Sequence, residues 1–218
     1  MIVFMPLIVV TSINTLLIPD LSQIISKGDY YFAAVRIKKV MKIAFILGIA
    51  TMIICLLIPN ELGEMLYERD DLGNYIKYAA MSSPVFFPSV TMNGILNGIN
   101  KQNIILRNSL IIAVLELIGL FIFTSIPSIN IYGYTITLLL TSIISLIINI
   151  YEIKKTIDME ISITNIVIYC LLGILIYFIL KIIVTKVIVE VTIFKSIILI
   201  LFTFGIFSYL STFGEEYN

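Results

Sequence analysis

The stretch "MNGILNGINKQN", from Met92 to Asn103, decides how this chain folds, because it closes a long apolar run with asparagines. Asparagine in hydrocarbon leaves its amide donors and acceptor without water, at a cost of roughly several kcal/mol unless they find partners. Two glycines, Gly94 and Gly98, alternate with these asparagines. The meaning of the pattern depends first on whether the segment lies in a membrane.

The composition of the whole chain answers that question. Hydrophobic residues make up 60% of the 218 residues and charged residues 13%, whereas a soluble domain carries roughly 25% charged residues. Apolar runs recur from end to end, so we expect an all-α, polytopic membrane protein. The net charge is zero and histidine is absent, which argues against nucleic acid as a partner, against imidazole catalysis and against the commonest zinc sites. We expect no cofactor and no metal.

About seven apolar segments approach or reach the length needed to cross the hydrocarbon layer. They are Ile2–Ile18, Ile43–Ile58, Tyr78–Ile95, Asn108–Ile126, Ile131–Tyr151, Thr164–Ile183 and Ile193–Leu210. An amphipathic segment, residues 20–42, follows the first span. Asp20 after Pro19 is predicted to cap its first turn, and Gly28 with Asp29 is predicted to break the helix and restart it. The restarted helix should run directly into the second span.

The distribution of basic residues predicts the orientation of the chain. With the loop after the first span in the cytoplasm, nine Lys and Arg residues lie on the cytoplasmic side and five on the outer side. The N-terminus is then outside and the C-terminus inside. Most of the asymmetry comes from a basic face on the amphipathic segment, formed by Arg36, Lys38, Lys39 and Lys42. We expect this face to meet anionic membrane lipids.

The beginning of the chain also carries information. The first ten residues, "MIVFMPLIVV", enter an apolar segment with no polar leader. Because no Lys or Arg precedes the apolar part, a signal peptide is not expected. An odd number of spans with so abrupt a start is typical of a polytopic protein that lacks its front, so we expect a C-terminal fragment.

The opening stretch can now be interpreted as a helix inside a membrane. Asn93, Asn97 and Asn100 would be spaced i, i+4 and i+7 and would form one polar stripe. Gly94 and Gly98 would form a parallel GxxxG stripe that allows another helix to approach closely. Two interpretations stay open. The pattern is either a packing seam, or one side of a bent helix that lines a solvated cavity.

Other residues bear on the cavity. Pro84 and Pro88 each remove an intrahelical hydrogen bond and are predicted to kink this span. Glu116 is an acidic residue deep inside a span, where a carboxylate should face the bundle interior or a water-filled cavity; a structural hydrogen bond to another helix is the alternative. In the first span Asn14 stands out, because Ser and Thr can bond to their own helix. The candidate cavity residues are therefore Asn14, Asn93, Asn97 and Glu116.

Two stretches resemble a known family. One is "MPLIVVTSINTLLIPDLSQIISKGDYYFAAVRIKKVMKIAFILGI", which is similar to a segment of polysaccharide flippases where a helix ends in a leucine–proline–serine-type turn before a basic amphipathic segment. The other is "FFPSVTMNGILNGINKQN", which is similar to the later element where a small-residue helix ends in a glycine-rich cytoplasmic turn. These flippases belong to the multidrug/oligosaccharidyl-lipid/polysaccharide exporter superfamily. The resemblance is to its stage V sporulation protein B-like branch and covers roughly Met5 to Ile150.

The resemblance implies a fourteen-helix architecture, with two six-helix lobes related by a pseudo-two-fold axis and two added C-terminal helices. Residues 1–151 would then be a second-lobe-like bundle, and residues 152–218 the added helix pair with a short tail. The first lobe has no counterpart in this sequence. The resemblance therefore implies that lobe as a partner, because alternating access needs two lobes that move about a central site.

The function implied by the resemblance is the flipping of a lipid-linked oligosaccharide or cell-wall precursor across the membrane, in polysaccharide export or sporulation. The cavity would hold the saccharide headgroup while the polyprenyl tail stays in the bilayer, and neutral asparagine side chains suit a sugar. A pyrophosphate would need Arg or Lys. None lies in the middle of a span, so the missing lobe or Arg36 and Lys39 would supply that charge.

Other classes stay open. A cation-coupled multidrug antiporter of the same superfamily would use Glu116 as its proton or sodium site. A membrane-embedded glycan-processing enzyme would need a reactive cluster near one interface. The acidic segment "NELGEMLYERDD", residues 60–71, matches no calcium-loop or paired-carboxylate spacing. We therefore expect a transporter and not an enzyme. A non-transporting partner or a truncated gene product is the third class.

Overall fold

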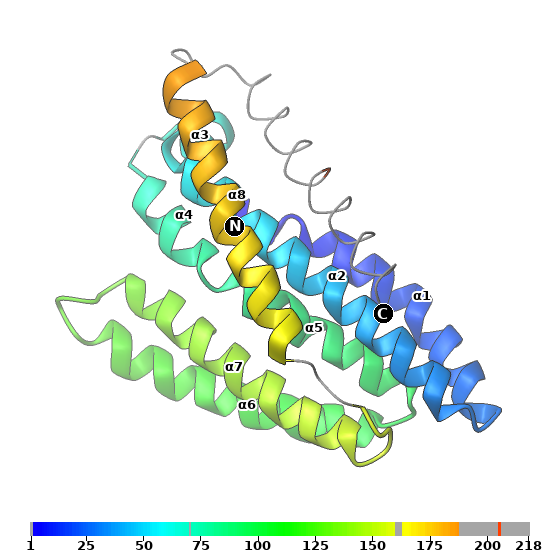
Figure 1. The fold of residues 1–218 in the computed structure, drawn as a ribbon. Helices are drawn as coiled ribbons and strands as arrows, with labels where there is room; N and C mark the ends of the chain where they lie inside the picture. Colours follow the sequence, from blue (N-terminus) through cyan, green and yellow to red (C-terminus); the bar gives the residue numbers. More distant parts are fainter. Residues whose placement is uncertain (1, 70, 160–162, 188–204, 206–218) are drawn as a thin grey trace. The chain divides into compact units, whose positions relative to one another are not determined.

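The computed structural model describes residues 2–69, 71–159, 163–187 and 205. Every regular element in these residues is helical: one short 3-10 helix at Ile2–Phe4 and eight α-helices (Figure 1). The α-helices are α1 Leu7–Ser26, α2 Tyr30–Leu57, α3 Pro59–Tyr67, α4 Gly73–Ala80, α5 Ser83–Gly98, α6 Gln102–Thr124, α7 Tyr132–Lys154 and α8 Ile163–Val187. The predicted all-α fold is confirmed.

Several helices are long and apolar enough to cross a membrane. Among the described residues there are five of them: α1, α2, α6, α7 and α8. They correspond to the first, second, fourth, fifth and sixth predicted spans and make this chain a multi-pass membrane protein. The last predicted span, Ile193–Leu210, lies outside the described residues except for residue 205.

The third predicted span, Tyr78–Ile95, is wrong as a continuous helix. Helix α4 ends at Ala80 and α5 begins at Ser83. Pro84 explains the break, because its ring would clash with the carbonyl group four residues earlier, which belongs to Ala80. Pro84 itself lies in the first turn of α5, where its missing N–H has no helical partner to lose. Its predicted kink is therefore also wrong, whereas Pro88 does lie inside α5.

Helix α1 continues beyond the predicted end of the first span. It runs through Pro19 as far as Ser26. The next turn buries Leu21 completely, and such packing outweighs the one hydrogen bond that Pro19 removes. Asp20 is consequently inside a helix, so its predicted capping role is wrong. Its carboxylate instead accepts a hydrogen bond from Nε of Arg36 at 2.7 Å.

The predicted break between α1 and α2 is confirmed. Gly28 has a φ of +76°, a left-handed conformation that glycine adopts without cost. Asp29 follows, and its Oδ1 accepts a hydrogen bond from the backbone N–H of Phe32 at 3.2 Å. This bond satisfies one of the free N–H groups at the start of α2. The helix then runs without interruption for 28 residues.

The chain forms two compact units whose segments alternate along the sequence. One unit contains the described parts of residues 1–3, 49–80 and 162–218. In it α3 packs against α4, and a Cβ added to Gly173 of α8 would lie 2.7 Å from Cγ2 of Ile49. The other unit contains residues 4–48 and the described part of 81–161. The predicted domain boundary after residue 151 stays a prediction.

The second unit holds the residues that matter for function. Helix α5 packs along α1 on one side and along α7 on another, and α7 packs along α6 (Figure 1). An apolar core ties together α1, the first half of α2, α5 and the end of α7 with the residues after it. Its members are Leu17, Leu21, Ala33, Ala34, Ile37, Val40, Met92, Ile95, Leu96, Ile99, Ile153, Ile157 and Met159.

The predicted basic face lies on the part of α2 that contributes to this core. Arg36, Lys38 and Lys39 are exposed, whereas Lys42 is partly buried. The buried residues between them, such as Ile37 and Val40, give this part of α2 one apolar and one charged side. Contact of the basic face with anionic lipid in the cytoplasmic leaflet stays a prediction.

Candidate functional site

The glycine stripe of α5 forms a tight seam with α1. A Cβ added to Gly94 would lie 2.7 Å from Cγ of Asn14, and one added to Gly98 would lie 2.9 Å from Cβ of Leu21. Atoms that close would overlap, so only glycine lets the two helices approach to this distance. On this side of α5 the packing interpretation of the opening stretch is the one that the structure shows.

Asn14 belongs to this seam. It is buried, and its Nδ2 donates a hydrogen bond to the backbone carbonyl of Val90 at 3.4 Å. Its buried Oδ1 accepts no hydrogen bond from the residues that the structure describes. The predicted cavity residue therefore lies between α1 and α5, packed onto Gly94, and is not among the residues that line the cavity described next.

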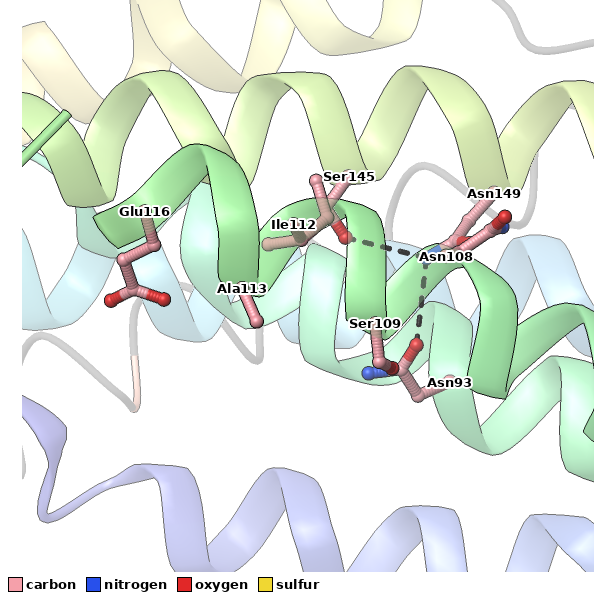
Figure 2. A pocket seen from close by; sticks show the side chains of 8 residues that line it. All are labelled: Asn93, Asn108, Ser109, Ile112, Ala113, Glu116, Ser145 and Asn149. Atoms are coloured by element: carbon pink, nitrogen blue, oxygen red, sulfur yellow. Dashed lines mark hydrogen bonds between the residues drawn. The ribbon is translucent and has the colours of Figure 1, made fainter. Parts of the chain in front are cut away.

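A polar cavity of about 160 Å³ lies where α5, α6 and α7 meet (Figure 2). This volume corresponds to about five molecules of liquid water. The lining residues are Asn93 from α5, Asn108, Ser109, Ile112, Ala113 and Glu116 from α6, and Ser145 and Asn149 from α7. The structure thus brings two of the predicted cavity residues, Asn93 and Glu116, to one site. Because the lining residues Ser109 and Ala113 are exposed, the cavity opens on the surface of this unit.

Hydrogen bonds between side chains connect the three helices at the cavity. Asn108 of α6 donates from Nδ2 to Oδ1 of Asn149 of α7 at 2.8 Å. Asn149 in turn donates from Nδ2 to Oγ of Ser145 at 3.4 Å and, at 3.5 Å, to Oδ1 of Asn93 of α5. Both Asn108 and Asn149 are buried. The amide nitrogen of each of these two residues donates to the amide oxygen of the next asparagine. These hydrogen bonds offset the cost of placing polar groups inside the bundle.

The network continues to a charged cluster at the start of α6 and the end of α7. Arg107 donates from Nη2 and Nε to Oδ1 of Asn108, at 3.0 and 3.2 Å, and from Nη2 to Oε1 of Glu152 at 2.7 Å. Lys155 lies 3.3 Å from the other oxygen of Glu152. The side chain of Glu152 is only 9% exposed, whereas those of both cations are about half exposed. Two cations thus compensate one buried carboxylate.

Two groups in the cavity retain free hydrogen-bonding capacity. Among the residues that the structure describes, no partner faces the carboxylate of the partly buried Glu116 or Nδ2 of Asn93. Ser109 adds an exposed hydroxyl group. The cavity therefore presents an amide donor, a carboxylate acceptor and a hydroxyl group that does both. This set can bind a polar ligand or water, and the described residues include no cluster of acids or cysteines suited to a metal.

The predicted stripe of three asparagines is wrong at its last member. Helix α5 ends at Gly98, and Asn100 has a left-handed φ of +59° in the turn that follows. The N–H of Asn100 bonds to the carbonyl of Asn97 at 3.1 Å, and that of Lys101 to the carbonyl of Leu96 at 2.9 Å. This is a Schellman ending, in which asparagine replaces the usual glycine. Asn97 stays on α5 and is partly buried, but it does not line the cavity.

Sequence reasoning missed four residues of the network. Asn108 is the first residue of the fourth predicted span, and Arg107 stands just before it. Asn149 is a single amide in the apolar run of α7, and Glu152 falls one residue past the predicted end of that span. The available signal was their spacing, because Asn149 and Glu152 are three residues apart and share one helical face.

The sequence of this chain matches a known protein family. Residues 1–122, more than half of it, match the MatE family. The chain belongs to the MatE family. This family is part of the multidrug/oligosaccharidyl-lipid/polysaccharide exporter superfamily, as the sequence resemblance predicted. The matched region contains Asn93, Asn108 and Glu116, whereas the whole of α7 lies beyond it.

One relative of this MatE chain is the stage V sporulation protein B of Bacillus subtilis (strain 168). It is 20% identical over 159 residues, which are 73% of this chain and 31% of that protein. The chain therefore spans about a third of the length of that relative. No solved structure matches the chain.

Proposed function

We propose that this chain is part of a membrane transporter that moves a lipid-linked oligosaccharide or cell-wall precursor across the cytoplasmic membrane by alternating access. The observation that carries the proposal is the cavity between α5, α6 and α7, which gathers neutral amides and hydroxyl groups within otherwise apolar helices. Membership of the MatE family supports transport as the activity. The name of the sporulation relative supports a role in sporulation.

The chemistry of the cavity suits the headgroup of such a substrate. Sugar hydroxyl groups both donate and accept hydrogen bonds, and Asn93, Ser109 and Glu116 offer both kinds of partner. The cations for a pyrophosphate are proposed to come from Arg36 and Lys39 or from the first lobe. Among the residues that line this cavity there is neither Arg nor Lys.

The outer surface of α6 suits the lipid part of the substrate. Side chains along this helix are exposed and apolar, and they begin within one turn of the cavity: Leu106, Leu110, Val114, Leu117, Ile118 and Phe121. An apolar face of this kind is stable against acyl chains but not against water. The polyprenyl tail can therefore stay in the bilayer beside α6 while one sugar unit of the headgroup occupies the cavity.

A cation-coupled multidrug antiporter is the second candidate, and Glu116 is the observation that favours it. Its carboxylate lies in the cavity and has no partner among the described residues. A proton or sodium ion bound there would change the charge of the site during transport. The two candidates predict different behaviour when Glu116→Gln removes that charge and keeps the shape.

The test uses proteoliposomes that contain the complete protein, including any further spans encoded in frame before Met1. One assay follows flipping of a fluorescent polyprenyl-pyrophosphate disaccharide, and the other follows ethidium efflux driven by a pH gradient. Flipping that falls in Asn93→Leu and persists in Glu116→Gln supports the saccharide flippase. Asn97→Leu is the matched control, because this asparagine lies on the same helix but does not line the cavity.

Two results together would favour the antiporter over the first proposal. Ethidium efflux would depend on the pH gradient, and this efflux would be lost in folded Glu116→Gln. The partner lobe is tested separately. An upstream reading frame that encodes six or seven further spans supports the proposed first lobe, and transport by the 218-residue chain alone contradicts the need for it.

A further inference from the structure

We infer that Arg107 is a positioning residue that fixes the direction of every hydrogen bond in the network and thereby makes Asn93 face the cavity as a donor. Hydrogen bonds connect Arg107 to Asn108, Asn108 to Asn149, and Asn149 to Asn93 in that order. An asparagine amide has two ends of nearly equal shape, one that donates and one that accepts, so its direction is set by its neighbours.

The first step is the contact between Arg107 and Asn108. A guanidinium group has donors and no acceptor. Two of its nitrogens, Nη2 and Nε, donate to Asn108 at 3.0 and 3.2 Å, so Asn108 must turn its carbonyl oxygen toward Arg107. Its Nδ2 then points the other way and donates to Asn149 at 2.8 Å.

The second step carries this direction to the cavity. Because Asn149 accepts from Asn108 with Oδ1, its own Nδ2 is left to donate, and it does so to Ser145 and to Oδ1 of Asn93. The oxygen of Asn93 is therefore used on the side of α7. As Figure 2 shows, the amide nitrogen of Asn93 points away from Asn149. The cavity receives the donor end.

Burial and charge keep the arrangement in place. Glu152 holds Nη2 of Arg107 at 2.7 Å, and its side chain is 9% exposed. Asn108 and Asn149 are 4% and 1% exposed, so water has little access to substitute for either partner. Reversing any one amide would place two donors or two acceptors against each other inside the bundle, which is costly where water cannot intervene.

The consequence for the ligand rests on the proposed function. With Asn93 as donor at one end and Glu116 as acceptor at the other, the cavity matches a sugar ring that accepts at one position and donates at another. The acetamido and hydroxyl groups of a sugar have these properties. If the amide of Asn93 were reversed, both ends of the cavity would present acceptors, and a sugar carbonyl would lose its partner.

The test reverses the direction without removing the network. In Asn149→Asp the new carboxylate can only accept, so it accepts from Asn108 and from Asn93, and Asn93 must turn its nitrogen away from the cavity. Asn108→Asp has the same expected outcome by a different route, because its carboxylate accepts from Arg107 and from Asn149. The new carboxylate at position 108 also forms an ion pair with Arg107, which should stabilise the fold. This variant therefore keeps the test available if Asn149→Asp is unstable. Ser145→Asp is the matched control, since Ser145 already accepts from Asn149.

The readout is nuclear magnetic resonance of the 218-residue chain in nanodiscs, with ¹⁵N only in asparagine. The side-chain signal of Asn93 is assigned by its disappearance in Asn93→Leu. Its Nδ2 protons should exchange quickly with water in the unmodified chain. They should exchange about tenfold more slowly in Asn149→Asp and Asn108→Asp, because a carboxylate now holds them, and at an unchanged rate in Ser145→Asp.

Unchanged exchange in both reversing variants overturns the inference, and so does slowing in all three variants. This readout uses no substrate, so it stands or fails independently of the proposed function. In the flipping assay the reversing variants should then raise KM about tenfold with kcat little changed. Slowed exchange in the reversing variants without this KM change keeps the control of Asn93 by the network and removes the saccharide assignment.

Discussion

Helix α5 has two sides that differ sharply although they use neighbouring residues. Gly94 lies against Asn14 of α1 in contact so tight that it leaves no room for a Cβ. Asn93, one residue earlier, lines a cavity with groups from α6 and α7. Successive residues of a helix point about 100° apart, so one short stretch supplies both surfaces. The seam and the cavity are thus not competing interpretations of the same pattern.

The two sides also satisfy polar groups in different ways. Across the seam, Asn14 makes one long hydrogen bond and its Oδ1 has no partner among the described residues. Across the cavity, Asn108 and Asn149 are more deeply buried, and each both donates and accepts. Close packing therefore stabilises the first side, and hydrogen bonds between matched polar groups stabilise the second. The first predictions below each change one side, and the last changes an ion pair away from α5 as a reference.

The largest effect is expected at the seam. Gly94→Ile should prevent the close approach of α1 and α5, because even the Cβ would lie 2.7 Å from Cγ of Asn14. Overpacking costs about 1–3 kcal/mol when neighbours can move and more when a helix must shift, so most of the folded protein in detergent should be lost. Gel filtration and thermal unfolding measure this loss.

A compensating pair provides the control for the seam. Gly94→Ala alone should destabilise, and Asn14→Gly with Gly94→Ala should recover a large part of the loss, because the side chain that the new methyl group meets is removed. No recovery in the pair would contradict the steric account of the seam.

The next largest effect is expected in the charged cluster beside the cavity. Glu152→Gln replaces a charged acceptor of Arg107 and Lys155 by a neutral one. Because both cations are about half exposed and can be hydrated, the free energy of unfolding should fall by about 2 kcal/mol. The corresponding drop in Tm is on the order of 5 °C. Lys155→Leu, which removes only the 3.3 Å contact and keeps the pair of Glu152 with Arg107, should unfold at a higher temperature than Glu152→Gln. Equal unfolding temperatures for the two would contradict this.

A smaller effect on stability is expected from Asn93→Leu. Asn149 keeps Ser145 as an acceptor for its Nδ2, and leucine suits a membrane helix, so the free energy of unfolding should change by less than about 1 kcal/mol. Flipping of the lipid-linked probe should nevertheless fall. Loss of stability together with transport would show that Asn93 serves packing, as Gly94 does.

The smallest effect is expected at an exposed ion pair, which is the reference for the buried one. Hydrogen bonding and charge from Arg69 hold the pKa of Asp71 below its ordinary value. A lowered pKa adds stability above the ordinary carboxyl range and loses it as the pH falls through the lowered value. Both side chains are exposed, so Asp71→Asn should change Tm at neutral pH by no more than about 1 °C, and the difference should vanish in acid. A change as large as that of Glu152→Gln would remove the contrast between the two pairs.

Hydropathy and periodicity predicted much of the fold, because a helix that crosses a lipid bilayer needs a long apolar run. Hydropathy could not reveal the break between Ala80 and Ser83, because the sequence stays apolar across the end of α4. Only the position of Pro84, four residues after Ala80, shows why α4 ends there. Asn14 was predicted as a cavity residue for its polarity alone, and the structure places it in the seam.

The network was harder to predict for a different reason. Arg107 and Glu152 are 45 residues apart, and each stands at the end of an apolar run where a charged residue is ordinary. Their pairing depends on how α6 packs along α7, which no local pattern specifies. Asn93 and Glu116 could be predicted because each is a polar residue within an apolar span. Their neighbours in the folded protein could not be predicted, because those depend on how the helices pack.

The measurement that tests the central contrast most directly is the access of water to the two sides of α5. After replacement of Cys55 and Cys170 by alanine, single cysteines are introduced by Asn93→Cys and Ser109→Cys at the cavity and by Asn14→Cys and Thr91→Cys at buried positions. Native membranes are treated with a water-soluble maleimide, which reacts with thiols only where water reaches them. The account predicts rapid labelling at positions 93 and 109 and almost none at 14 and 91. Equal labelling of both sets, or labelling at 14 without 93, would contradict it.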